Sequence, residues 1–370
     1  MDDADFLERA LELARRGEGH TRPNPPVGAV VVKGGKIIGE GWHKRCGGDH
    51  AEVAAIKDAL RKLKHSNAQK LKNCTLYVTL EPCSKPGRVG ACTDAIVVAG
   101  IKKVVYAVPD PNPKNRGKAK RVLAKHGIEC VNAGARRTTL ATASRRLRRW
   151  ITRPAVQPVH GAGPSRPRET KPLIASAERL IAPFARHVTT GLPYVTVKIA
   201  MSLDGNICDD YGNARWISSE KSRQMTGRLR EKVDAIMVGA ETVRKDNPSL
   251  LSHGKRNDDL IRVVMTRSGK LPKTAQIFTD GAPNKTIVFN TETQRHRGGI
   301  KGVLRELGKM GVMHVLCEGG LNLARSLADA GLVDEWITVL APKVIGSRRI
   351  GKAVLIPRAS VLPDNGITLR

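Results

Sequence analysis

Four residues near the start of the chain have the types and the order that zinc chemistry requires. His50 and Glu52 are separated by one residue, and Pro82-Cys83 and then Cys92 follow them. One imidazole and two thiolates can hold Zn²⁺ while its fourth position stays open to water. A His-x-Glu sequence followed by Pro-Cys and a second Cys is the order found in zinc-dependent deaminases. The residues therefore predict a hydrolytic metal site at His50, Cys83 and Cys92.

Glu52 has a different predicted task from the three ligands. It can face the water without binding the metal, take up the water's proton and deliver it to a ring nitrogen and then to leaving ammonia. The alternative is two unrelated thiols beside a turn, because Cys83 and Cys92 are nine positions apart and zinc-binding cysteines are usually separated by only about two to four residues. The turns that return Cys92 to the metal can come from Pro86, Gly87 and Gly90.

A second candidate site follows an apolar run late in the chain. The sequence VLCEGG places Glu318, Gly319 and Gly320 between a predicted strand and a predicted helix. Backbone N–H groups at such a helix N-terminus can bind a phosphate. The spacing does not match the Gly-x-Gly-x-x-Gly fingerprint of common dinucleotide folds, and a Gly-Gly turn can also be only a helix entry.

The elements that must position these residues form two α/β patterns. Residues 4–16 and 50–64 have helical apolar spacing, residues 27–43 contain a strand, a Gly-Gly turn and a strand, and further strands and helices alternate to about residue 135. A second alternation begins at Tyr194. The Pro, Gly, Lys and Arg residues between them predict a flexible linker. We therefore expect a domain at 1–145, a basic linker at 146–187 and a second domain at 188–370, both domains of the α/β class.

Composition restricts the partners and the compartment. The net charge of +30 favours anionic ligands such as phosphorylated metabolites, dinucleotides or nucleic acid, or it reflects a basic solvated surface. Seven scattered cysteines do not form a disulfide framework, and the N-terminus does not resemble a signal peptide. The chain has no apolar run long enough to span a membrane. We expect a cytoplasmic protein without a membrane partner.

The first half resembles the deaminase half of the bifunctional riboflavin-biosynthesis deaminase/reductases. The motifs RPNPPVGAVVV, EGWH, HAEVAAI, YVTLEPCSKPGR and DPNP occur in the family's order, and the gap between the cysteines is the family's own. The resemblance implies a cytidine-deaminase-like α/β/α domain with zinc on His50, Cys83 and Cys92 and Glu52 as proton shuttle. It also implies that the substrate contacts include Asn24, His43, Arg88, Asp110 and Asn112. Turn formation is the alternative role of Asn24, Asp110 and Asn112, because each neighbours a proline.

The second half resembles the reductase half of the same family, through LPYVTVKIAMSLDGNI, GNARWISS, VDAIMVGAETVRKDNPSL and VLCEGGLNLARSLADAGLVDEWITVLAPKVIG. The resemblance implies a dihydrofolate-reductase-like α/β domain that uses NADPH. It implies NADPH contacts at Ala200, Trp216, Thr242, Asp246, Gly320, Leu321, Asn322, Leu323, Ala324, Arg325 and Ser326. It implies contacts to the reductase substrate at Ala214, Arg230, Leu250 and Glu318, and Lys198 and Asp204 can also face the site.

Some positions depart from the family pattern. Lys85 stands where a histidine is common, His253 stands near a usual arginine, and family chains continue beyond GITLR. The main hypothesis is an enzyme that deaminates a diaminopyrimidinone carrying a ribosylamino phosphate and then reduces the ribose with NADPH. The alternatives are a deaminase with an impaired reductase domain and a deaminase of tRNA or single-stranded DNA. The long cysteine gap and the few aromatic residues disfavour nucleic acid as the substrate. We also expect a homo-oligomer.

Overall fold

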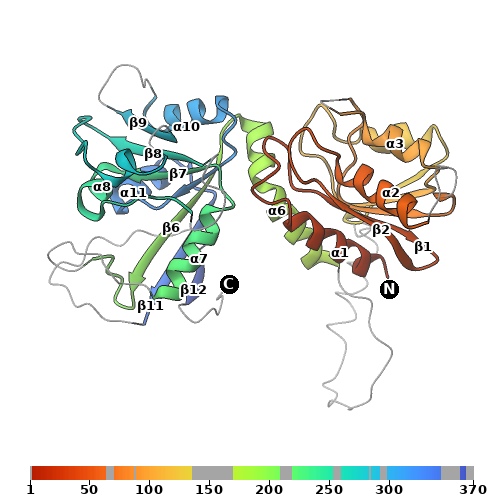
Figure 1. The fold of residues 1–370 in the computed structure, drawn as a ribbon, viewed down its shortest axis with the longest axis horizontal. Coiled ribbons are helices and arrows are strands. Elements are labelled where there is room, and N and C mark those ends of the chain that lie inside the picture. The colour runs from red at the N-terminus through yellow and green to blue at the C-terminus, as the bar shows by residue number, and fades with distance from the viewer. Residues whose placement is uncertain are drawn as a thin grey trace, which may run out of the picture. The chain divides into compact units, whose positions relative to one another are not determined.

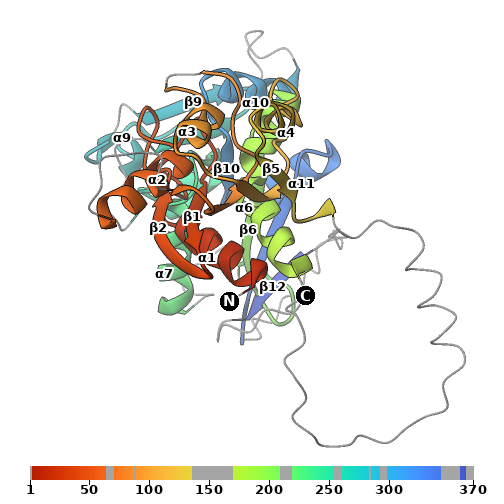
Figure 2. The same cartoon turned by 90° about the vertical axis from the view of Figure 1, so that its right-hand side faces the viewer.

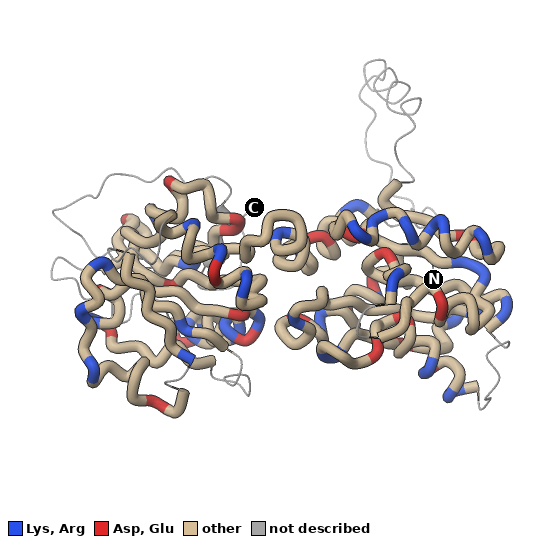
Figure 3. The backbone as a smooth tube through the Cα atoms, turned by 90° about the horizontal axis from the view of Figure 1, so that it is seen from above, with Lys and Arg blue, Asp and Glu red and all other residues tan. Residues whose placement is uncertain are grey.

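The computed structural model describes residues 2–63, 71–86, 89–135, 170–208, 219–252, 260–282, 285–291, 298–342 and 359–363. The chain forms two compact units, one of residues 1–21 and 25–181 and the other of residues 22–24 and 182–370. Lys and Arg occur on helices and loops of both units (Figure 3). Among the described residues, no helix is long and apolar enough to cross a membrane.

The first unit is built on a five-stranded sheet with the order β2-β1-β3-β4-β5. The strands are β1 (Gly28–Lys33), β2 (Lys36–Trp42), β3 (Thr75–Leu80), β4 (Lys103–Val108) and β5 (Glu129–Asn132). β1 pairs antiparallel with both β2 and β3, whereas β3, β4 and β5 are parallel. The predicted hairpin is confirmed: Gly34 and Gly35 have φ of 55° and 75°, and such values fit a two-residue hairpin turn.

Helices cover both faces of this sheet (Figure 1). On one face lie α2 (Ala51–Lys62), α3 (Cys92–Val98) and α4 (Lys118–Ala124), whose apolar side chains share a core with those of the strands. On the other face lie α1 (Asp3–Arg15) and the first part of α6 (Thr170–Thr190), which run side by side in Figure 2. The result is the expected three-layer α/β/α arrangement.

Helix α6 contradicts part of the predicted linker. The linker was expected to extend over 146–187, but residues 170–190 are helical, and Ala177 and Ile181 are buried in the core on the α1 face of the sheet. Leu173, Ile174, Ala177, Leu180 and Ile181 recur at helical spacing, so an apolar stripe is present among the prolines and basic residues. Residues 146–169 lie outside the described residues.

The second unit has a seven-stranded sheet with the order β12-β11-β6-β10-β7-β8-β9, in which every neighbouring pair is parallel. Its strands are β6 (Tyr194–Ser202), β7 (Ala235–Gly239), β8 (Ile261–Thr266), β9 (Thr286–Asn290), β10 (His314–Cys317), β11 (Glu335–Ala341) and β12 (Ala359–Pro363). The second α/β alternation expected from Tyr194 is confirmed, and it comprises strands β6 to β11 with helices between them.

The helices of the second unit pack into two separate cores. α10 (Gly299–Lys309) and α11 (Leu321–Asp329) contribute to the larger core, and α7 (Glu220–Arg230), α8 (Ala240–Asp246) and the short α9 (Gln276–Thr279) contribute to the smaller one. Parallel strands covered on both faces read as continuous apolar runs. The carboxyl ends of these strands meet at one edge, where the second group of candidate site residues lies.

Candidate functional site

Helix α2 carries the first two zinc-site residues. His50 is the N-cap residue and Glu52 lies in the first turn, where its side chain is 4% exposed. Gly41 on β2 lets this helix pack closely, because a Cβ at Gly41 would lie 2.3 Å from the backbone nitrogen of Ala55 and 2.6 Å from the carbonyl oxygen of Ala51. The glycine therefore brings the start of α2 close to the sheet.

The two cysteines come from either end of the loop between β3 and α3. Cys83 lies shortly after β3, and Cys92 is the first residue of α3. The backbone N–H of Cys92 donates to Sγ of Cys83 at 3.3 Å, so Cys83 also lies at the N-terminus of α3. A helix N-terminus favours the thiolate form of a nearby cysteine.

The three side chains converge as a metal site requires. Nδ1 of His50 lies 3.2 Å from Sγ of Cys92 and 3.6 Å from Sγ of Cys83. One ligand atom from each residue fits within 4.8 Å of the others. One nitrogen and two sulfur donors suit Zn²⁺ in a catalytic site. The residues present therefore fit the metal that the sequence predicted.

The electrostatics of this cluster separate the roles of its members. The hydrogen bond from the Cys92 thiol lowers the pKa of Cys83 to about 4 although burial opposes the shift, and His50 lowers it further. The same interaction raises the pKa of Cys92. Burial raises the pKa of Glu52 to about 7, with help from the charge on Cys83. A carboxyl group with a pKa near neutrality can both accept and donate a proton.

The other described deaminase residues lie on loops, and His43 is the one that contacts the zinc cluster. His43 is buried, its Nδ1 lies 2.9 Å from the carbonyl oxygen of Asp49, and its ring packs edge-on against that of His50 with the centroids 5.1 Å apart. Burial lowers the pKa of His43, so the ring is neutral near pH 7. Asn24 is half-buried between α1 and β1. Arg88 lies outside the described residues.

Asp110 and Asn112 make the turn contacts that were the alternative to substrate binding. The N–H of Asn112 donates to Oδ1 of Asp110 at 2.8 Å, and the N–H of Lys114 donates to Oδ1 of Asn112 at 3.0 Å. Each is a side-chain bond to the backbone two residues onward, as in an Asx turn. These bonds fix the loop, and Oδ2 of Asp110 accepts a further bond from Nδ2 of Asn115 at 2.6 Å.

Two positioning residues were missed from the sequence. The buried carboxylate of Glu81 accepts from the backbone N–H groups of Asp110, Gly117 and Ala119 at 3.2, 3.0 and 3.3 Å. Asn115 accepts from both the N–H and the hydroxyl of Ser84 and donates to Asp110 at 2.6 Å. These bonds connect the loop of Cys83 to the loop of Asp110. The sequence signal that could have identified Glu81 is its place as an acidic residue directly after the apolar strand β3.

The predicted NADPH residues of the second unit lie around the carboxyl ends of three strands. Thr242 and Asp246 are on α8 after β7, Gly320 caps α11 after β10, and Ala200 is on β6. A Cβ at Gly319 would lie 2.8 Å from the backbone nitrogen of Gly239, whereas one at Gly320 would meet nothing within 4 Å. This close approach and the open helix N-terminus form a cradle that fits a dinucleotide phosphate. Trp216 lies outside the described residues.

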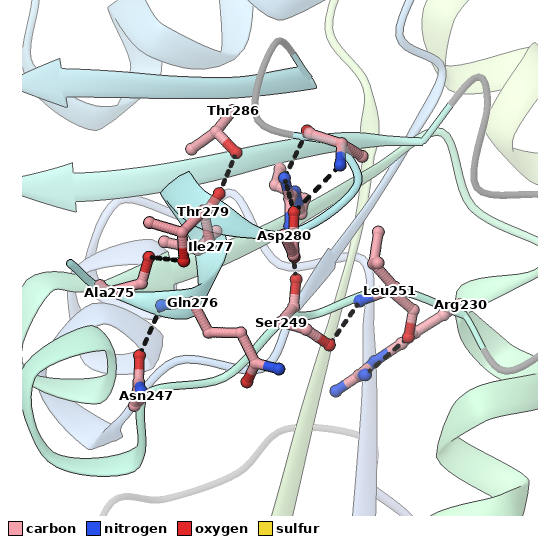
Figure 4. Close-up of polar contacts among 12 residues, drawn as sticks. Arg230, Asn247, Ser249, Leu251, Ala275, Gln276, Ile277, Thr279, Asp280 and Thr286 are labelled. Carbon is pink, nitrogen blue, oxygen red and sulfur yellow. Dashed lines mark hydrogen bonds and ion pairs between the residues drawn. The ribbon is translucent and has the colours of Figure 1, made fainter. Parts of the chain in front are cut away.

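Arg230 and Glu318, both predicted substrate contacts, pair with each other. Nε of Arg230 donates to Oε1 of Glu318 at 2.7 Å and Nη2 donates to Oε2 at 2.9 Å. A third bond, from Nη1 to the carbonyl oxygen of Leu251, measures 3.1 Å and is visible in Figure 4. Burial alone would raise the pKa of Glu318, but Arg230 and Lys198 outweigh burial and lower it. Burial in turn lowers the pKa of Lys198.

The remaining predicted reductase residues are found as follows. Leu250 is buried and has a φ of 59°, which is rare for a residue with a bulky side chain and marks a conformation that its surroundings must hold. Asp204 accepts from Nδ2 of Asn206 at 2.8 Å in the turn after β6. Ala214 and the departure at His253 lie outside the described residues.

Comparisons with known proteins agree with both halves of this geometry. The cytidine and deoxycytidylate deaminase zinc-binding region matches residues 1–108, and the RibD C-terminal domain matches residues 193–356. The chain is 33% identical over 359 residues to the riboflavin biosynthesis protein RibD of Aquifex aeolicus, covering 93% of this chain and 88% of the relative. The chain belongs to the RibD family.

Other RibD proteins cover nearly the whole chain. The RibD protein of Escherichia coli is 33% identical over 384 residues, covering 96% of this chain and 92% of the relative. The structure of Acinetobacter baumannii RibD matches with a TM-score of 0.74 at 32% identity, covering 96% of this chain and 91% of that chain. A Thermotoga maritima deaminase/reductase matches with the same score at 33% identity, covering 93% and 88% of the two chains.

Membership of the RibD family fixes the activity class. The chain is a bifunctional enzyme of riboflavin biosynthesis, with a zinc-dependent deaminase domain and an NADPH-dependent reductase domain. Its substrate is a phosphorylated pyrimidine. The main hypothesis from the sequence is confirmed at this level, and the expected cytidine-deaminase-like and dihydrofolate-reductase-like fold classes are confirmed with it.

Proposed function

We propose that His50, Cys83 and Cys92 hold the zinc ion and that Glu52 moves the protons of the deamination. The observation that carries this assignment is the convergence of the three donor atoms within 4.8 Å beside a buried Glu52. Zinc, when bound, supplies the Lewis acid that makes water a nucleophile near neutral pH. Glu52 accepts the water's proton, delivers it to the ring nitrogen and then protonates the departing ammonia.

The deaminase substrate is 2,5-diamino-6-(ribosylamino)-4(3H)-pyrimidinone 5′-phosphate. Asn24 can donate to and accept from the edge of its pyrimidinone ring. Neutral His43 is held by the carbonyl of Asp49 and faces the zinc cluster through His50. Arg88, Asp110 and Asn112 complete the proposed contacts to the ring and the ribose phosphate. The basic charge of the chain favours this anionic ligand.

The reductase unit then converts the ribosyl group of the deaminated product to a ribityl chain. NADPH supplies the hydride, and the protein's task is to bind and orient the two reactants and to exclude water. We assign NADPH to the cradle of Gly319 and α11 together with Ala200, Trp216, Thr242 and Asp246. Arg230, Leu250, Glu318 and Ala214 bind the pyrimidine, with Lys198 beside the ion pair.

A coupled assay on the diamino substrate tests both halves at once. Without NADPH, mass spectrometry should find one product in which an amino group has been replaced by oxygen. With NADPH, the product should gain two further hydrogens while absorbance at 340 nm falls. Deamination without NADPH oxidation would instead support the impaired-reductase hypothesis. Conversion of bases in tRNA or single-stranded DNA would support the nucleic-acid alternative.

The domain boundaries and the assembly also belong to this proposal. We place the boundary between the deaminase domain and the reductase domain within α6, after Ile181, because the early turns of α6 pack in the deaminase core. A homo-oligomer in the cytoplasm remains the expectation from the sequence. Sedimentation equilibrium of the full chain would measure the number of subunits.

A further inference from the structure

Arg262 occupies a position where the sheet requires an apolar side chain. It lies on β8 and is 0% exposed. Because side chains alternate along a strand, Arg262 faces the same side as Leu260 and Val264, which are members of the smaller core of the reductase unit. Burying an arginine is costly even when it is paired, and a well-packed apolar residue is often at least as stable there. Stability alone therefore does not account for an arginine at this position.

The guanidinium group of Arg262 holds two loops. Nη1 donates to Oδ2 of Asp280 at 2.5 Å and Nη2 donates to Oδ1 at 3.1 Å. Nη1 also donates to the carbonyl oxygen of Ser249 at 2.7 Å, and Nη2 donates to the carbonyl oxygen of Ala282. Asp280 thus fixes the orientation of the arginine, and the arginine fixes the backbone of Ser249.

Ser249 begins a short chain of contacts that ends at the proposed substrate site. The N–H of Leu251 donates to Oγ of Ser249 at 3.4 Å, and the carbonyl oxygen of Leu251 accepts from Arg230, as Figure 4 shows. Arg230 in turn pairs with Glu318. The backbone on either side of Leu250 is therefore tied to Arg262 before it and to Arg230 after it.

Leu250 itself needs such support. Its φ of 59° places a buried leucine in the left-handed region, where glycine is usual. A strained residue persists only when neighbouring contacts determine its conformation. The carbonyl of Ser249, held by a buried arginine, and the carbonyl of Leu251, held by Arg230, are contacts of that kind.

We propose that Arg262 and Asp280 form a positioning pair that sets the shape of the reductase's substrate-binding loop, residues 247–252. The pair acts through Ser249 to place Leu250 and Arg230 for the phosphorylated pyrimidine and makes no contact with substrate itself. The inference rests on the proposed substrate roles of Arg230, Leu250 and Glu318. Arg262 and Asp280 lie outside the sequence motifs that carry the family resemblance.

The test compares Arg262→Lys and Asp280→Asn with the unaltered full chain. Each variant should raise the KM for the deaminated pyrimidine by about tenfold and leave kcat within about threefold, because the loop is misplaced while the hydride donor is not. The KM for NADPH should stay within about twofold. The deaminase rate of each variant should equal that of the unaltered chain, and this comparison corrects for differences in the amount of intact protein.

Arg305→Lys is the matched control. Arg305 is an exposed arginine on α10 of the same unit. The same chemical change there should leave the KM for the pyrimidine, the KM for NADPH, the reductase kcat and the deaminase rate unaltered. If Arg262→Lys yields an unfolded reductase unit, as judged by thermal unfolding, Asp280→Asn carries the test, because it keeps the size of the side chain and the arginine's bonds to the two carbonyls.

The outcomes separate this inference from the proposed function. Arg230→Lys should raise the KM for the pyrimidine whether or not Arg262 positions the loop. If Arg230→Lys has this effect but Asp280→Asn and any folded Arg262→Lys change only the unfolding temperature, the positioning role is wrong. If Arg230→Lys leaves that KM unchanged, the proposed substrate site is wrong. Equal rises in the KM values for pyrimidine and NADPH in the Asp280→Asn variant would also overturn the positioning role.

Discussion

The two units each bury a glutamate at the candidate site, and the two carboxyl groups are in opposite electrostatic states. Burial raises the pKa of Glu52 to about 7, and the negative charge of the Cys83 thiolate raises it further. Glu318 is also largely enclosed, with 10% of its side chain exposed, yet Arg230 and Lys198 hold its pKa below the ordinary value. The sign of the neighbouring charge decides the state of a buried carboxyl group.

This difference matches the division of labour between the units. The deaminase must transfer protons, so it needs a carboxyl group that can change charge near pH 7. The reductase receives its reactive hydride from NADPH, so its glutamate can remain an anion that orients Arg230. The same residue type therefore serves as a proton carrier in one unit and as a fixed charge in the other.

The largest expected effect comes from Glu52→Gln. The amide keeps the shape of the side chain but cannot carry the proton, so the deaminase rate should fall by about 10³-fold. Zinc content, measured by atomic absorption, and NADPH oxidation with the deaminated substrate should remain unchanged. A deaminase rate within tenfold of the unaltered enzyme would contradict the contrast between the two glutamates.

Glu318→Gln should have the next largest effect and should change binding. Loss of the carboxylate leaves Arg230 buried beside a neutral amide, which should lower the unfolding free energy of the reductase unit by about 3 kcal/mol. The KM for the pyrimidine should rise, and the deaminase rate should not change. A reductase pH profile that gains or loses a titrating group near pH 7 would show that Glu318 exchanges protons as Glu52 does.

Gly319→Ala tests the cradle instead of the charges. The new Cβ would lie 2.8 Å from the nitrogen of Gly239 and 3.0 Å from Cα of Val238, so the backbone must shift, with a loss of about 1–3 kcal/mol in unfolding free energy. The KM for NADPH should rise with it. Gly320→Ala is the steric control, because a Cβ there meets nothing within 4 Å and stability should be retained.

The last prediction concerns His314, the first residue of β10, whereas Glu318 follows the other end of the same strand. Burial lowers the pKa of His314 to about 4 from 6.5. The folded state then binds fewer protons than the unfolded state in this window, so stability is complete above pH 6.5 and is lost as pH falls toward 4.

The slope from His314 should be at most about 1.4 kcal/mol per pH unit. Urea unfolding of the reductase unit between pH 4 and 7 measures it, and His314→Gln should flatten the curve. The lowered pKa of Glu318 affects stability only below its ordinary value of 4.5. An unchanged slope in the His314→Gln variant would assign the pH dependence to another group.

The two sites also differ in how much of them could be predicted from sequence. The zinc cluster could be predicted because His50 and Glu52 share one helical turn and Cys83 and Cys92 lie at the two ends of one loop. Ligand geometry restricts residue types within such short stretches. The close pairing of Arg230 with Glu318 could not be derived in this way, because the two residues are 88 positions apart and meet only in the folded sheet.

Arg262 and α6 show two other limits. Arg262 lies in an apolar run, IRVVMT, in which a single charged residue is usually taken to face solvent. Only its spacing of two residues from the apolar Leu260 and Val264, which places all three on one face of the strand, indicates that Arg262 is buried. In α6, prolines and basic residues suggested a linker, although the apolar stripe through Ala177 and Ile181 was present. Composition and periodicity disagreed there, and periodicity described the structure correctly.

The position of Cys92 as the first residue of α3 couples metal supply to the folding equilibrium of one unit. Because zinc binds cysteine as the thiolate, binding at Cys92 displaces the thiol proton, so zinc uptake releases acid and becomes tighter as pH rises. Each tenfold increase of free zinc above its dissociation constant adds about 1.4 kcal/mol to the folded deaminase unit. Within the described residues the metal-ligand cluster is confined to His50, Cys83 and Cys92, so scarcity of zinc should weaken the first reaction of this enzyme and spare the second.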